Sequence, residues 1–160
     1  MLPNWEDRPE ITAHLMNPAF CSEIIRECVI AYKGEVGTNF PYSLSILVLP
    51  LILNARIIER LPKNKSNTIH NWINKNEDLK INLAYNIKSL IPFSNEAIMF
   101  AIAHNSLGID NDGNIYSISK RGKPKDGEII KCYEKAKVLG KVLAHSGSPL
   151  TIYSILGIKP

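Results

Sequence analysis

Apolar residues recur every three or four positions along much of the chain, which is the spacing of amphipathic helices. The first such stripe consists of Phe20, Ile24, Cys28 and Ala31. Asn17 and Pro18 precede it, and an Asn followed by Pro is typical of a helix N-cap and first helical position. The pattern predicts a helix that begins after Asn17 and ends near Gly34, followed by a loop to Gly37.

A second apolar stretch predicts a helix that begins near Pro41 and extends to Leu61. Pro50 lies inside it, and the missing N–H should kink the helix near Ile46. A buried strand over residues 44–49 is the alternative, which the Ile and Val content allows. The apolar run covers residues 44–53, about half of the roughly 20 residues that a bilayer-spanning helix needs. We therefore expect a buried core helix and no membrane segment.

Three more helices are expected between residues 66 and 105. The first is capped by Ser66 or Asn67, and its buried residues are Ile69, Trp72 and Ile73. The second begins at the acidic residues 77 and 78 and ends at Pro92, because proline disfavours helix in the residue before it. The third begins at Ser94 or Asn95, and its buried residues are Ala97, Ile98, Ala101 and Ile102.

Residues 107–118 have the pattern of a β-hairpin, since two short β-type runs flank Asn111, Asp112 and Gly113. A basic loop (120–126), an amphipathic helix (128–143) and an apolar tail (150–160) follow, and residues 1–15 are expected to form an extended arm. The sequence predicts a mainly α, single domain over residues 1–160 with a small hairpin. This element order is compatible with a winged helix, in which residues 107–118 are the wing and residues 94–105 take the recognition position.

Composition supports an ordinary globular domain. The chain has 160 residues, of which 45% are hydrophobic and 21% are charged, and this excludes a disordered, collagen-like or coiled-coil protein. Cys21 and Cys28 lie about 10 Å apart along one helix, too far for a disulfide. Together with a polar N-terminus that does not resemble a targeting segment, the odd number of cysteines indicates a reducing, cytoplasmic setting.

Charge is distributed unevenly. Residues 120–141 contain eight basic and three acidic residues, a net +5 against +4 for the whole chain, whereas residues 1–30 carry −3. The basic loop could therefore contact a phosphate backbone. Its candidate residues are Lys120, Arg121, Lys123 and Lys125. The alternative is that the lysines at 131, 135 and 141 are only the solvated face of a helix.

Motifs that carry catalysis are missing from the sequence. The four histidines are scattered, with no ligand spacing, and neither a phosphate-binding loop nor a GxSxG turn is present. We therefore expect a protein that is not an enzyme and has no catalytic, cofactor-binding or metal-ligating residues.

Several short stretches resemble one known family. These are residues 5–10 (WEDRPE), 15–21 (LMNPAFC), 47–51 (LVLPL), 61–62 (LP) and 156–160 (LGIKP). They are similar to the middle component of bacterial three-component ABC systems. The resemblance implies a small adaptor that links an SMC-like or Rad50-like ABC ATPase to a separate effector protein in defence against phages and mobile elements.

Two functions follow, an adaptor subunit of an ATPase complex or an autonomous winged-helix DNA-binding regulator. A regulator needs cations on its recognition helix, but residues 95–105 contain no Lys or Arg, which favours the adaptor. The basic loop could still touch nucleic acid inside the complex. The two chain ends either pack against their own domain or anchor a partner, since aromatic and Arg side chains tend to dominate interfaces. The expected partner-interface residues are Trp5, Arg8, Asn17, Phe20, Ile158, Lys159 and Pro160.

Overall fold

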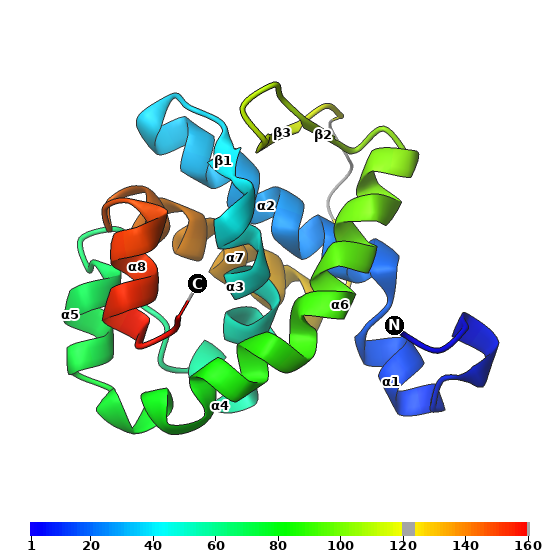
Figure 1. Cartoon of the computed structure of the whole chain (residues 1–160), viewed down its shortest axis with the longest axis horizontal. Coiled ribbons are helices and arrows are strands. Elements are labelled where there is room, and N and C mark those ends of the chain that lie inside the picture. Colours follow the sequence, from blue (N-terminus) through cyan, green and yellow to red (C-terminus); the bar gives the residue numbers. More distant parts are fainter. Residues whose placement is uncertain (120–123, 160) are drawn as a thin grey trace.

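The fold is mainly helical, with a small antiparallel sheet at one end (Figure 1). A computed structural model describes residues 1–119 and 124–159. Helices α2 (Pro18–Val36), α6 (Leu83–Ala103) and α7 (Gly127–Ala144) pack around α3 (Tyr42–Ile52), which is buried along most of its length. The predicted mainly α fold with a hairpin is confirmed. The winged-helix assignment stays a prediction.

Residues 1–15 are largely helical, so the predicted extended arm is wrong. They contain a 3-10 turn, η1 (Trp5–Asp7), and a short helix, α1 (Glu10–Leu15). Pro9 directly precedes α1 and Glu10 lies in its first turn, where its charge favours the helix. None of residues 1–16, all of which the structure describes, is buried as a whole, although the side chain of Arg8 is largely covered.

The Asn17 cap of α2 is confirmed. The Asn17 side chain accepts hydrogen bonds from the backbone N–H groups of Ala19 (2.9 Å) and Phe20 (3.4 Å). The helix continues past Gly34 and ends at Gly37, which has a φ of +75°. The predicted end was too early because Gly37, not Gly34, adopts the left-handed conformation that terminates a helix.

The helix predicted over residues 41–61 is divided into shorter elements. Pro41 belongs to the short strand β1 (Phe40–Pro41), and α3 includes Pro50. Asn54 interrupts the helical path because its side chain accepts from the N–H groups of Arg56 and Ile57 and starts a new helix, α4 (Ala55–Ile58). The alternative of a strand over residues 44–49 is wrong.

Helix α5 (Ile69–Asn74) buries the three predicted residues, Ile69, Trp72 and Ile73. Its cap is Thr68 rather than Ser66 or Asn67, because the Thr68 hydroxyl accepts from the Asn71 N–H at 3.2 Å.

Helix α6 passes through Pro92, which corrects both the predicted stop and the predicted new cap at Ser94 or Asn95. A 3-10 segment, η2 (Glu77–Asn82), leads directly into it. An internal proline costs one helical hydrogen bond and about 3 kcal/mol. Burial of apolar side chains on both sides of Pro92, including Ile87 and Ala97, offsets this cost. Ile102, predicted to be buried, is exposed.

The hairpin is confirmed and gains a third strand. Strands β2 (Leu107–Ile109) and β3 (Asn114–Ser117) are antiparallel, and β1 pairs with the other edge of β3, giving the order β1-β3-β2. In the turn, the Asp110 carboxylate accepts from the N–H groups of Asp112 and Asn114, both at 2.9 Å, and Gly113 has a φ of +78°.

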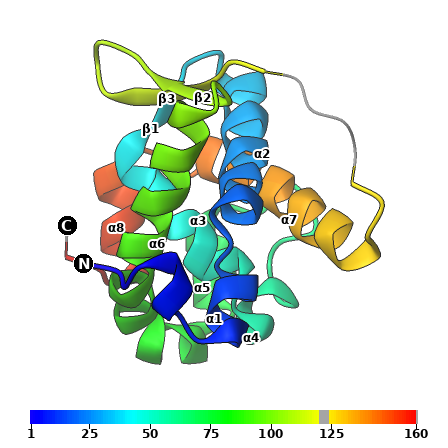
Figure 2. The same cartoon turned by 90° about the vertical axis from the view of Figure 1, so that its right-hand side faces the viewer.

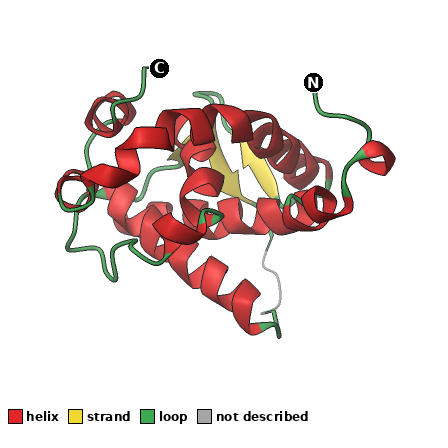
Figure 3. Cartoon of the chain, turned by 90° about the horizontal axis from the view of Figure 1, so that it is seen from below, coloured by secondary structure: helices red, strands yellow, loops and turns green. Residues whose placement is uncertain are grey.

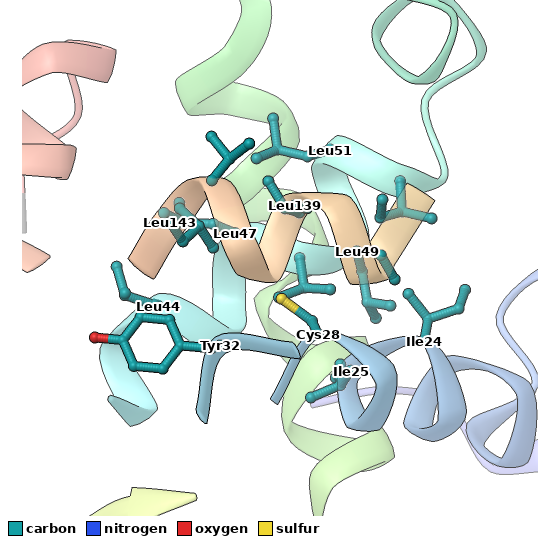
Figure 4. Close-up of a cluster of buried hydrophobic side chains, with 14 of the residues drawn as sticks. Ile24, Ile25, Cys28, Tyr32, Leu44, Leu47, Leu49, Leu51, Leu139 and Leu143 are labelled. Atoms are coloured by element: carbon teal, nitrogen blue, oxygen red, sulfur yellow. The ribbon is translucent and has the colours of Figure 1, made fainter. Parts of the chain in front are cut away.

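The core lies where α2, α3 and α7 meet (Figure 4). In this view Leu47 of α3 lies beside Leu143 of α7, and Leu44 and Leu139 belong to the same cluster of buried side chains. The predicted apolar tail forms helix α8 (Pro149–Leu156), which packs beside α5. Ile152, Tyr153 and Leu156 of α8 are buried, so this segment completes the core of its own chain.

Candidate partner surface

An apolar groove of about 750 Å³ lies between α3, α6 and the C-terminal end of the chain. Its apolar side chains come mainly from Ile46, Ala84, Ile87, Ile91 and Ile158. Lys88 and Lys159 also line the groove, and both are exposed. Acidic residues are missing from the described lining. The groove is therefore suited to an apolar group flanked by negative charge.

Two tyrosines fix the walls of this groove. The Tyr153 hydroxyl donates to the Ser43 carbonyl oxygen, which ties α8 to the start of α3. The Tyr42 hydroxyl donates to the Asn95 side-chain oxygen at 2.9 Å, which ties α3 to α6. Burial raises the pKa of Tyr153, so this phenol stays a donor at neutral pH. The groove is thus held open by contacts between its own walls.

Arg8 attaches the first residues of the chain to α6. Its guanidinium donates to both carboxylate oxygens of Glu96, at 2.8 and 2.5 Å, and to the Pro3 carbonyl oxygen at 3.1 Å. The hydrogen bonds to Glu96 raise the pKa of Arg8. The same guanidinium lies 5.3 Å from the centre of the Trp5 ring, within cation–π range. Trp5 is still 44% exposed, so one part of its surface is available.

The two chain ends lie on the same face of the molecule, on opposite sides of α6. Figure 1 places the N-terminus to the right of α6 and the C-terminus to its left, and Figures 2 and 3 show both ends projecting toward the same side. The predicted interface residues Trp5 and Arg8 therefore form one group, and Ile158 and Lys159 form another beside the groove.

The remaining predicted interface residues are arranged differently. Asn17 caps α2, and Phe20 is half-buried and stacks on Tyr133 of α7 at a centroid distance of 6.2 Å. Both have structural partners within the chain, so a role in binding stays a prediction. Pro160 lies outside the described residues.

Of the four candidate nucleic-acid contacts, the structure describes only Lys125, which is exposed. Lys120, Arg121 and Lys123 lie outside the described residues. Directly before them, the Ser119 carbonyl oxygen accepts from the buried guanidinium of Arg26. Helix α2 thus fixes the start of the basic loop.

Two lysines of α7 are paired with acids. Lys131 donates to Glu59 at 2.5 Å, and Lys137 donates to Glu134 at 2.7 Å. The hydrogen bond with Glu59 raises the pKa of Lys131, and the same bond lowers the pKa of Glu59. These pairs reduce the positive charge that the sequence suggested for this helix.

The two cysteines of α2 are buried and are held as neutral thiols. Burial raises the pKa of the Cys21 thiol to about 12 and that of Cys28 further still. No three His, Cys, Asp or Glu side chains among residues 1–119 and 124–159 gather as a metal site. Within those ranges, every helix is too short or too polar to cross a bilayer.

The groove was not foreseen from the sequence. Its walls come from residues near positions 42, 87 and 158, which no local pattern connects. The only signal was the mixture of apolar residues and a lysine at the end of the chain, at Ile158 and Lys159.

Comparison with known proteins identifies the family. The model of the family described as ABC-three component (ABC-3C) system Middle Component 3 matches residues 5–160. The curated proteins and the solved structures give no match. The family match begins at Trp5 and includes the groove and the hairpin, and it confirms the resemblance seen in the sequence. The chain therefore belongs to the Middle Component 3 family of ABC-three component systems.

Proposed function

We propose that this protein is a non-enzymatic adaptor that links an ABC ATPase to a separate effector protein in the cytoplasm, in prokaryotic defence against phages and mobile elements. Membership in a family of middle components supports a role between two other proteins. In this proposal the chain ends are where the protein meets other chains of the complex.

The observation that carries the proposal is the exposed apolar face of α1. Ile11 and Leu15 lie one helical turn apart and are 75% and 58% exposed. Helices shorter than about 12 residues are marginal in isolation, and this helix of six residues buries none of them. Apolar anchors one turn apart are the mark of a helix that docks into a partner. We assign this face to the ATPase or the effector.

The alternative, an autonomous winged-helix regulator, has less support. The exposed residues in the C-terminal part of α6 include Met99 and Ile102, where a recognition helix would present polar and basic side chains. Lys131 and Lys137 form ion pairs with Glu59 and Glu134, respectively. The exposed Lys125 leaves room for a phosphate contact inside the complex.

The experiment is co-purification with the products of the neighbouring genes. The chain carries the tag, and Ile11→Asp is compared with Ile130→Asp, which makes the same change on α7 at a residue that is also exposed. We expect Ile11→Asp to weaken binding of the ATPase or effector by at least about 30-fold, the effect of losing an interface anchor, and so to reduce its recovery. Ile130→Asp should leave recovery unchanged.

Circular dichroism must show that both variants are folded. Equal recovery with Ile11→Asp and the unmodified chain would contradict the assignment of α1. Failure of the unmodified chain to recover either protein would contradict the adaptor function.

A further inference from the structure

The lining of the groove and the first residues of the chain are complementary in polarity and charge. The groove is apolar, and Lys88 and Lys159 are the charged residues of its lining. The N-terminal segment, defined here as residues 1–7, carries the exposed Trp5 followed directly by the exposed acids Glu6 and Asp7. An indole buries about 150–250 Å² of surface when it enters an apolar site.

We propose that the groove binds the N-terminal segment of a second copy of this chain. Trp5 of one copy enters the groove of the other, and Glu6 and Asp7 lie beside Lys88 and Lys159. This inference deepens the proposed function, on which it rests, because it assigns the partner of the two chain ends and leaves α1 for the ATPase or effector.

The segment of the same chain does not occupy the groove. Arg8 is fixed to Glu96 by two hydrogen bonds, and the Trp5 ring lies over that guanidinium. The groove is lined by α3, α6 and residues 153–159, and the C-terminus lies on the opposite side of α6 from the N-terminus (Figure 1). Because the groove and the N-terminal segment lie on opposite sides of α6, the segment binds the groove of another molecule rather than that of its own chain.

The placement of the chain ends favours a closed dimer over a filament. Both ends lie on one face, with α6 between them (Figures 1 and 3). Consider a two-fold axis that lies in the plane of this face and passes between the N-terminus and the C-terminus. Rotation about this axis places the same face of a second molecule against the first. Each N-terminal segment then lies over the groove of the other copy. The contact forms twice and leaves no free groove, which is the closure that a two-fold dimer requires.

The first test measures the mass of the isolated chain by sedimentation equilibrium up to about 100 µM, far above a micromolar dissociation constant. We expect a dimer. Trp5→Ala should weaken dimerisation by at least about 30-fold, and Ala84→Arg, at an exposed position in the groove lining, should weaken it similarly. Ile130→Asp on α7 is the control, since α7 extends toward the opposite side from the chain ends (Figure 2).

The second test exchanges the charges. One variant carries Glu6→Lys and Asp7→Lys, and the other carries Lys88→Glu and Lys159→Glu. Each variant alone opposes like charges in both contacts of its dimer, whereas the mixture pairs opposite charges in both. We expect each variant to shift toward monomer and their mixture to dimerise as well as the unmodified chain. All four altered positions are exposed, so these variants are expected to fold.

A chain that remains monomeric at this concentration overturns the inference. A dimer that Trp5→Ala, Ala84→Arg and the charge exchange all leave unchanged also overturns it, because the copies then meet through another surface. Neither result bears on the adaptor function, which the Ile11→Asp co-purification tests separately. Loss of ATPase or effector recovery with Ile11→Asp, in a chain that still dimerises, supports both.

Discussion

Gly140 lies where α7 crosses α2, and replacing it with alanine tests the packing of these helices. A Cβ at this position would lie 2.3 Å from the backbone oxygen of Cys28 and 3.1 Å from the Cβ of Ala31. Non-bonded carbon atoms have their optimum at about 3.5–4.0 Å. The Cys28 oxygen belongs to the backbone of α2 and cannot rotate away. The added methyl group must therefore push the two helices apart.

The expected cost follows from this overlap. Forcing an extra methyl group into a packed core costs about 1–3 kcal/mol, and separating helices at a backbone contact belongs at the upper end. Replacing Gly by Ala inside a helix contributes up to about 1 kcal/mol in the other direction. We expect Gly140→Ala to lower the free energy of unfolding by about 1–2 kcal/mol.

Gly34→Ala is the matched control. Gly34 lies in α2, and a Cβ there would meet no atom of the described residues within 4 Å. This variant gains helix propensity without a clash and should be more stable than the unmodified chain by up to about 1 kcal/mol. Urea denaturation gives both free energies, provided that the slope with urea stays constant. Equal stabilisation by the two alanines would refute the argument that α2 and α7 require glycine at their crossing.

Three further predictions concern the turn, the pH dependence and catalysis. Gly113→Val should lower the free energy of unfolding by about 1 kcal/mol or more, because Gly113 has a φ of +78° and a β-branched residue is strained there; an unchanged melting temperature would argue against it. The Glu35 carboxylate accepts from His145 (2.9 Å) and Lys65 (3.0 Å), and these hydrogen bonds, the one from His145 first, lower the pKa of Glu35. A carboxylate whose pKa is lower in the folded state stabilises the protein at pH values above its unfolded pKa of about 4.3, and this stabilisation is lost as the pH falls through the folded pKa. Glu35→Gln should therefore be less stable than the unmodified chain at pH 7, and the difference in stability should disappear in acid. A difference in stability that does not change with pH would contradict the role of Glu35. The isolated chain should not hydrolyse ATP, as a phosphate-release assay can measure, and turnover abolished by a substitution in this chain would contradict a non-enzymatic role.

The sequence by itself determined the elements whose signals are local. Asn17 caps α2, the turn at Gly113 closes the hairpin, and α5 buries the expected residues. Each of these depends on residues within a few positions of one another, so the spacing along the chain contains the necessary information. The family resemblance had the same origin, because it rested on short runs of adjacent residues.

Tertiary structure alone decided whether local preferences were followed. Pro92 favours the end of a helix, but α6 continues because apolar residues on both sides of it are buried against α2 and α3. Strand β1 consists of only two residues, and it forms because its backbone pairs with the free edge of β3. Pairing across the fold depends on energies that no short window of sequence contains.

The candidate surface shows the same division. The sequence marked Trp5 and Ile158 as unusual at the two chain ends, which is a local observation. Only the folded chain pairs Arg8 with Glu96, 88 positions away, and forms a groove from three separated segments. Contacts of this kind come from the packing of whole helices, because burial of one apolar face decides which other faces remain exposed.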